Sequence, residues 1–361
     1  MKKILIEIGH PAHVHQFKNM YWELEKKGWK GLFVTKDKEC AIDLLKSYNL
    51  PHEILGVTKK GIASKILSLP YFAIKMFKVA ISFNPDVFVS RVSPLSGWSS
   101  FLLRKPHITF TDTENVKLLD SISEPFADVV LTSTSYLRDH GKKHIRYPGY
   151  HELAYLHPNR FDPNPKVLEK LDLESGDKYV IVRFVLGRAH HDFGHRVLNE
   201  EQKKYLVDEL SKKMRVFISS EGELPPCLEK YRLKIPAHYM HHVLDGASLF
   251  VGESATIASE CACLGVPSVY INDSQLGYTN EQQRYGLLYS YSSSSSDQDK
   301  AIRKSIELAS DGCIKTVSSS KKNTLLSEKI DVTAFMVWFV ENYPKSLIEA
   351  SKPDFCYSVF K

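Results

Sequence analysis

The segment from Ser248 to Asn272, SLFVGESATIASECACLGVPSVYIN, constrains the fold more than any other part of the chain. It predicts a buried strand over 248–251, a tight turn, a helix that ends at Gly265, and a second apolar strand over 268–271. In such a βαβ unit the helix start carries unpaired N–H groups and a positive dipole end, which can hold a diphosphate at the carboxyl edge of a parallel sheet. Glu260 could then reach sugar hydroxyls beside that anion. The alternative is an ordinary crossover whose small residues only allow close packing.

Length and composition indicate a folded protein of two domains. The 361 residues exceed the usual size of one domain, and the 43% apolar and 25% charged fractions are ordinary. A net charge of +6 with dispersed Lys and Arg argues against a dedicated nucleic-acid binder, while an anionic ligand or membrane surface stays compatible. No segment offers the ~18 apolar residues of a membrane span. The six cysteines show no metal spacing, which predicts reduced thiols in a cytoplasmic protein.

Histidines follow the first predicted strand, which covers residues 4–8. The turn and helix start GHPAHVHQF carries His10 and His13 at the sheet edge where open α/β folds place ligands. One or both could meet an anionic substrate or act as a base near neutral pH. The alternative is a pair of exposed imidazoles at a helix N-terminus.

Two carboxylates follow a later strand over 107–110. Asp112 and Glu114 come directly after it, and Arg91 ends the strand before. Because close carboxylates push their pKa values apart, this pair could form an acid–base site. The alternative is that Asp112 caps the next helix.

The segment 61–83 is apolar and carries Lys65, Lys75 and Lys78. A basic amphipathic helix of this kind could rest on an anionic bilayer and bring an enzyme to a lipid-linked substrate. Alternatively it only covers the sheet.

The second half predicts another α/β domain. Arg183 ends the strand 179–184 and Arg188 follows in a loop, so either could neutralise a diphosphate by bidentate contact. Arg284 lies in a predicted loop near the same crevice, and the serines of 290–296 predict a mobile loop. The expected boundaries are a first domain over 1–155, a linker over 156–175, a second domain over 176–322, and a helix (324–343) with a tail over 323–361.

Four segments carry a family resemblance: IEIGHPAHVHQFKN, YPGYHELAYLHP, VIVRFVLGRAHHD and GESATIASECACLGVP. The chain resembles the glycosyltransferase architecture called GT-B and, within it, domain-of-unknown-function family 354. The last segment also resembles the donor-binding segment of MurG-type transferases and of UDP-N-acetylglucosamine 2-epimerases. The implied fold is α/β, with two Rossmann-like domains facing across a cleft and a C-terminal helix crossing back.

The resemblance also implies site residues. It places Glu260 on the ribose and Ser254, Ala255 and Thr256 at the phosphates, and Ser254-Ala255 stands where a glycine pair is expected. The predicted catalytic residues are His10, His13, Asp112 and Glu114. The predicted donor-binding residues are Arg183, Arg188, His238, Glu253, Ser254, Ala255, Thr256, Glu260 and Arg284, and no metal is expected.

The function implied is a metal-independent glycosyltransferase that uses a nucleotide-diphosphate sugar, with UDP expected, and no other cofactor. The acceptor would be a glycan or a lipid-linked molecule in surface polysaccharide or glycolipid biosynthesis, with His13, His10 or Asp112 deprotonating its hydroxyl. We expect a cytoplasmic protein that could also make peripheral contact with the inner face of the membrane. No nucleic-acid partner is expected. Two alternatives stay open: a UDP-sugar 2-epimerase, with Asp112 and Glu124 as its acids, and a non-catalytic nucleotide- or glycan-binding protein.

Overall fold

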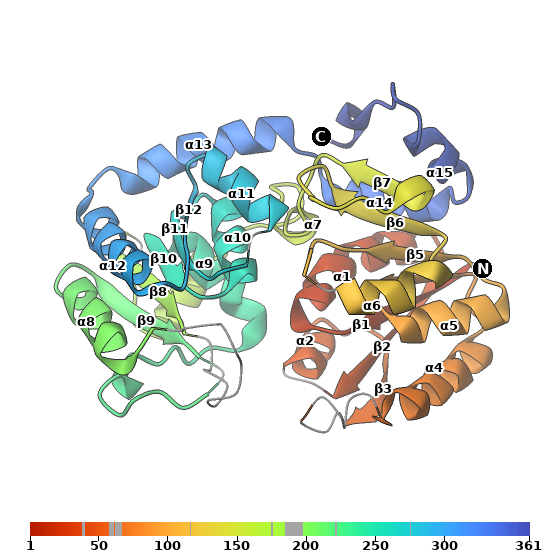
Figure 1. The fold of residues 1–361 in the computed structure, drawn as a ribbon, viewed down its shortest axis with the longest axis horizontal. Coiled ribbons are helices and arrows are strands. Elements are labelled where there is room, and N and C mark those ends of the chain that lie inside the picture. The colour runs from red at the N-terminus through yellow and green to blue at the C-terminus, as the bar shows by residue number, and fades with distance from the viewer. Residues whose placement is uncertain are drawn as a thin grey trace. The chain divides into compact units, whose positions relative to one another are not determined.

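The structure is a computed structural model in which the chain forms two units (Figure 1). The first unit comprises Met1–Arg160 and Lys329–Lys361, and the second comprises Phe161–Glu328. The described residues are 1–37, 40–57, 61, 67–115, 117–174, 176–184, 198–220, 222–274 and 276–361. Arg188 therefore lies outside the described residues.

The first unit is built on a parallel sheet with the strand order β3-β2-β1-β4-β5-β6-β7. The order reverses between β1 and β4, which pair in parallel from Ile4 opposite Val87. Ligands of open α/β sheets bind at such a switch point, outside the carboxyl ends of the strands. The strands are β1 (Lys3–Ile8), β2 (Lys30–Asp37), β3 (His52–Val57), β4 (Val87–Arg91), β5 (His107–Phe110), β6 (Val129–Ser133) and β7 (His144–Tyr147).

Helices cover both faces of this sheet. On one face α1 packs against α7 and α14, and on the other α4 packs against α5. The strands read as apolar runs because both of their faces are buried; Leu5 and Phe88, for example, join Phe72 and Met76 of α4 in one core cluster. The helices are α1 (Pro11–Lys26), α2 (Ala41–Ser47), α4 (Leu69–Phe83), α5 (Pro94–Leu103), α6 (Lys117–Ser123), α7 (Leu153–Leu156), α14 (Val332–Glu341) and α15 (Lys345–Ala350).

The second unit contains a parallel sheet with the order β12-β11-β10-β8-β9. Here the switch point lies between β8 and β10, where Gly252 pairs with Arg183. The strands are β8 (Tyr179–Arg183), β9 (Arg215–Ser219), β10 (Leu249–Gly252), β11 (Ser268–Ile271) and β12 (Leu288–Tyr291). The helices are α8 (Glu200–Ser211), α9 (Met240–Gly246), α10 (Ala255–Leu264), α11 (Gly277–Arg284), α12 (Ser295–Ser310) and α13 (Ile314–Glu328).

Three predicted segments differ in the structure. Residues 161–175, predicted as linker, belong to the second unit, because the 3-10 helix η3 (Pro165–Leu171) buries apolar side chains against α9. The helix predicted over 324–343 is two helices, α13 and α14, and the Asp331 side chain caps the second of them. The serine-rich stretch predicted as a loop contributes to β12 and to α12, whose N-cap is Ser294.

Candidate functional site

The N-terminus of α10 lies at the carboxyl edge of the second sheet, directly after the switch-point strand β10. Ser254 is the N-cap, and its Oγ accepts a hydrogen bond from the Ile257 N–H at 3.4 Å. Ala255 and Thr256 form the first turn and are half-buried. The structure thus places all three predicted phosphate-contacting residues at one helix start, where backbone N–H groups and the helix dipole favour an anion.

Gly252 allows the two switch-point strands to meet closely below this helix start. A Cβ atom on Gly252 would lie 2.6 Å from the Arg183 carbonyl oxygen, which is shorter than any normal contact. Glu253, the next residue, is buried and accepts a hydrogen bond from the Leu198 N–H at 3.1 Å. Glu253 was predicted to bind the donor, but its carboxylate contacts the backbone within the second unit.

Glu260 is buried two turns into α10 and is paired with a histidine that the sequence analysis did not select. His241 Nε2 lies 3.0 Å from Glu260 Oε1, and the two side chains are 8% and 6% exposed. A buried carboxylate needs such a partner, because desolvation otherwise disfavours its charge. His241 occupies the first turn of α9, which packs against α10. The signal that could have found it is the histidine run of 238–242, just before the βαβ unit.

The remaining predicted donor residues of the second unit take different positions. Arg183 ends β8 and donates to Ser219 Oγ at 2.9 Å, at the end of the neighbouring strand β9. His238 is half-buried in the 3-10 helix η5 (Ala237–Tyr239), which leads into α9. Arg183 and His238 therefore both lie at the carboxyl edge of the second sheet.

Arg284 does not lie there. It is the exposed last residue of α11, which leads from the carboxyl end of β11 to the amino end of β12. The loop predicted over residues 277–284 is a helix, and this helix carries Arg284 away from Ser254.

In the first unit, His10 and His13 lie at the start of α1, beside the sheet's switch point. His10 is the N-cap and its Nδ1 accepts from the Ala12 N–H at 3.2 Å, while His13 Nδ1 accepts from the Gly9 N–H at 3.2 Å. A nitrogen that accepts a hydrogen bond carries no proton, so each neutral ring carries its proton on Nε2. In this tautomer Nε2 is the hydrogen-bond donor of each ring.

Asp112 belongs to a polar cluster that draws on four segments of the first unit. Arg91, at the end of β4, forms an ion pair with Asp112 Oδ1, and its Nη1 lies 2.8 Å from His151 Nδ1. His151 Nδ1 lies 2.9 Å from Asp112 Oδ2. The Arg91 and Asp112 side chains are each 16% exposed, whereas that of His151 is 4% exposed. Arg91 and Asp112 therefore form the solvent-accessible edge of this cluster.

The buried part of the cluster has hydrogen-bonding capacity to spare. Within the described residues, Gln16 Nε2, Tyr147 Oη and His151 Nε2 are buried and have no hydrogen-bond partner. Gln16 Oε1 accepts from Arg91 Nη1 at 3.4 Å, and the rings of Tyr147 and His151 lie 6.4 Å apart. Buried polar atoms are nearly always hydrogen-bonded, so an internal water is the natural partner of these groups.

Burial and the neighbouring Arg91 charge hold the pKa of His151 well below its usual value. His151 is therefore neutral around pH 7. When its Nδ1 accepts from Arg91, the proton of the neutral ring lies on Nε2. His151 was not predicted as a site residue because the short strand β7, which precedes it, was not predicted.

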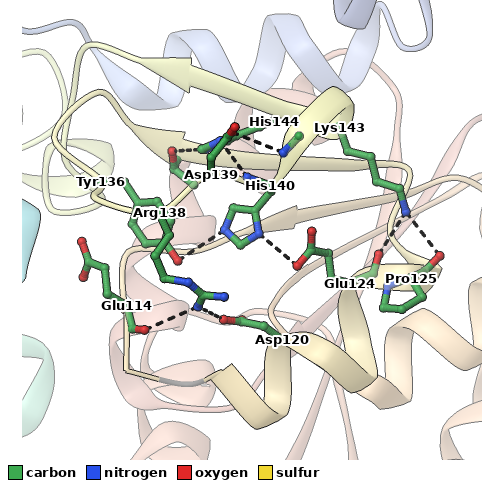
Figure 2. Close-up of polar contacts among 12 residues, drawn as sticks. Glu114, Asp120, Glu124, Pro125, Tyr136, Arg138, Asp139, His140, Lys143 and His144 are labelled. Carbon is green, nitrogen blue, oxygen red and sulfur yellow. Dashed lines mark hydrogen bonds and ion pairs between the residues drawn. The ribbon is translucent and has the colours of Figure 1, made fainter.

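Glu114 turns away from Asp112 and joins a separate network (Figure 2). Its Oε1 accepts from the Leu137 N–H at 3.2 Å, and Arg138 donates to its carbonyl oxygen at 3.4 Å while forming an ion pair with Asp120. The predicted carboxylate pair is therefore not assembled, because alternate residues after β5 serve different neighbours.

Glu124, the second acid of the epimerase alternative, lies in the same network. Its Oε2 is 3.0 Å from His140 Nδ1, and the His140 ring stacks on Tyr136. The network links the turn after β6 to the segment after β5. Glu124 therefore has a structural role in this network. Across the described residues, no group of three or more His, Cys, Asp and Glu side chains is arranged to hold a metal ion.

Two parallel α/β units, each with residues gathered at its switch point, define the class of protein as a GT-B fold. Solved structures with this fold include a protein from Listeria monocytogenes named as a putative UDP-N-acetylglucosamine 2-epimerase, at a TM-score of 0.68, 14% identity and 97% coverage of both chains. The spinosyn forosaminyltransferase SpnP matches at a TM-score of 0.64 and 12% identity, over 95% of this chain and 100% of its own.

The family model "Protein of unknown function (DUF354)" matches residues 2–311, and the chain belongs to this family. An uncharacterised protein of Methanocaldococcus jannaschii is 22% identical over 280 residues, which are 74% of this chain and 80% of that protein. No helix in the described ranges is long and apolar enough to cross a membrane.

Proposed function

We propose that this protein is a glycosyltransferase that takes a sugar from a nucleotide-diphosphate donor, with UDP as the nucleotide. The observation that carries the proposal is the start of α10, where an N-capped helix end at a switch point is followed, two turns on, by the buried Glu260. A diphosphate fits the helix end, and a carboxylate at Glu260's place can accept hydrogen bonds from ribose hydroxyls. The named activities of structural neighbours, an epimerase of a UDP-sugar and a sugar transferase, support the same ligand class.

Donor binding at Glu260 involves exchange of its present hydrogen bond. Its carboxylate already contacts His241, so a ribose hydroxyl would bind beside or in place of the imidazole. His241 would keep the carboxylate oriented when no donor is bound. It is a positioning residue in this proposal.

The group that takes up the acceptor's proton is Asp112 in this proposal. Its carboxylate is partly exposed, and the ion pair with Arg91 orients it. Asp112 removes the proton from an acceptor hydroxyl, whose oxygen forms a bond to C1 of the donor sugar while the bond from C1 to the diphosphate oxygen breaks. His10 and His13 would donate hydrogen bonds through Nε2 and not act as the base.

The leaving diphosphate carries the charge that needs stabilising. The N–H groups of Ala255 and Thr256, the dipole of α10 and the guanidinium of Arg183 would supply this, without a metal ion. The proposed reaction needs no cation at the phosphates. Added EDTA is therefore expected to leave the rate unchanged.

We place the acceptor on the first unit and assign it to the class of glycans or lipid-linked saccharides. This assignment is consistent with a role in surface polysaccharide or glycolipid assembly at the inner face of a membrane. It is supported by the partly exposed side chains of Arg91 and Asp112, whose polar atoms can hydrogen-bond a hydroxylated molecule.

A product assay tests the proposed reaction. The full-length protein is incubated with a panel of UDP-sugars, with and without glycan and lipid-linked acceptors, and free UDP is measured. Acceptor-dependent release of UDP supports a transferase. Absence of UDP release with every pair, together with calorimetric UDP binding, would leave a binding protein without turnover and overturn the proposal.

A UDP-sugar 2-epimerase is the second candidate. The observation in its favour is the contact of 2.9 Å between Asp112 Oδ2 and His151 Nδ1, because a carboxylate beside an imidazole could serve as an acid–base site for the carbon next to the anomeric centre. Against it, Glu124 is held by His140. Incubation of UDP-sugar alone in D₂O decides: deuterium at C2 supports the epimerase, and an unlabelled sugar excludes it.

A further inference from the structure

Helix α4 leaves an apolar stripe uncovered on its outer face. Phe72, Met76 and Ala80 are buried against the first sheet, as expected of a covering helix. The opposite face carries Tyr71, Ile74, Lys78 and Ile81, whose spacing of three, four and three residues places them on one side of the helix. Tyr71, Ile74 and Ile81 are 53%, 58% and 54% exposed. A helix that only covers a sheet normally has polar residues on this face.

The neighbouring helix α5 extends this apolar surface. Phe101 and Leu102, in its last turn, are 65% and 62% exposed. The two helices pack against each other on the same face of the first sheet (Figure 1). We define the α4–α5 patch as the exposed side chains of Tyr71, Ile74, Ile81, Phe101 and Leu102. Exposed apolar side chains gathered on two packed helices mark a candidate interaction site.

The charged residues on α4 and at the C-terminal end of α5 are all basic. The sequences of α4 and α5 contain no Asp or Glu, and neither does any position between Glu53 and Asp86 or between Asp86 and Asp112. The basic residues on and beside these helices are Lys75, Lys78, Arg104 and Lys105. Lys75 Nζ lies 4.8 Å from the Tyr71 ring centre, so a cation and an apolar ring lie side by side. Aromatic and aliphatic side chains with basic residues beside them match the boundary layer of an anionic bilayer.

A second copy of this chain fits the patch less well. In a symmetric dimer the same surface meets itself, so Lys78 and Arg104 would face like charges in an apolar contact. A lipid surface has no such conflict, because its phosphates are the complementary charge.

We propose that the α4–α5 patch docks the protein on an anionic lipid bilayer. Tyr71, Ile74, Ile81, Phe101 and Leu102 enter the headgroup boundary, and the lysines and arginine contact lipid phosphates. The inference rests on the proposed function only in that a docked enzyme would meet a lipid-linked acceptor. It explains why α4 carries apolar residues on both faces without being long enough to span a membrane.

Vesicle cosedimentation with the full-length protein tests this. We expect binding to phosphatidylcholine vesicles that contain phosphatidylglycerol, little binding to phosphatidylcholine alone, and weaker binding at high salt. The double variant Ile74→Asp/Ile81→Asp should lose about tenfold or more in vesicle affinity. Lys75→Glu/Lys78→Glu should lose binding to the anionic vesicles as well. All four positions are at the surface, so folding is expected to persist, which a thermal melt checks.

Ile348→Asp is the matched control, because Ile348 is 67% exposed on α15, outside the patch. It should bind vesicles like the wild type. Lack of binding to anionic vesicles, or equal binding by all variants, overturns the proposal. A wild-type dimer in sedimentation velocity also overturns the proposal if Ile74→Asp/Ile81→Asp converts that dimer to a monomer. The patch would then be a self-association surface. UDP binding without vesicle binding refutes this inference alone, whereas vesicle binding without any nucleotide binding refutes the proposed function alone.

Discussion

His241 and Glu260 form a buried pair, with Nε2 and Oε1 3.0 Å apart, between helices α9 and α10 of the second unit. Removal of the imidazole would leave a carboxylate without this partner in a desolvated place. His241→Leu is therefore expected to lower the free energy of unfolding by about 2 kcal/mol. Glu260→Gln should cost less, because the amide keeps a hydrogen-bonding oxygen. Urea unfolding of both variants and of the double variant measures the coupling, and strictly additive losses would show that the pair contributes nothing.

Asp112→Asn tests the assignment of the base. An amide keeps the size of the carboxylate but cannot accept the acceptor's proton, so kcat should fall by roughly 10²- to 10⁴-fold while UDP affinity stays the same. Glu114→Gln is the matched control, since the Glu114 side chain bonds the Leu137 backbone. It should alter stability more than kcat. An Asp112→Asn enzyme with wild-type kcat would place the base elsewhere.

Acid should weaken the first unit through His107, which is buried and whose pKa burial lowers from 6.5 to about 4. Below pH 6.5 the unfolded chain binds a proton that folded His107 does not, so the free energy of unfolding falls as the pH decreases toward 4. By pH 5 the loss from this group is about 2 kcal/mol. His107→Gln cannot titrate and can still hydrogen-bond Ser90. Its unfolding free energy should depend less steeply on pH between 6.5 and 5 than that of the wild type; equal slopes would contradict this.

Gly252→Ala tests the close approach of β8 and β10. The added methyl group would meet the Arg183 carbonyl oxygen at 2.6 Å, so the strands must separate. We expect a loss of about 1–3 kcal/mol in stability together with weaker UDP binding, since Ser254 follows two residues later. Gly312→Ala is the control, because nothing lies within 4 Å of the added atom. Equal melting temperatures for both variants would show that the strands tolerate the methyl group.

The fold could be predicted from sequence because its signals are local. Apolar runs such as Ile4–Ile8, a capping Ser254 and a helix stop at Gly265 each determine a short element, and their alternation implies parallel sheets. The short strand β7, HIRY, has too weak a pattern to be recognised. Because β7 was not predicted, His151 was not selected, although its Nδ1 lies 2.9 Å from Asp112 Oδ2.

The site was harder to predict because it depends on which way each side chain turns. Asp112 and Glu114 are two residues apart, yet one faces Arg91 and the other the Leu137 backbone. Glu253 and Glu260 are both buried, and the packing around each decides whether its partner is a backbone N–H or His241. Such choices depend on contacts between segments distant in sequence, and the spacing of residues in one segment cannot reveal them.

Calorimetric titration of UDP into the wild type and Glu260→Ala tests whether the nucleotide donor binds at α10. The Asp112→Asn variant serves as a control, because its substitution lies in the first unit and should leave the Kd of UDP within about twofold. We expect that UDP binds the wild type and that Glu260→Ala weakens UDP binding by about tenfold or more. The reason is that the variant loses a hydrogen bond to a charged group. Equal UDP affinity of Glu260→Ala and the wild type would contradict the assignment of the donor site to α10.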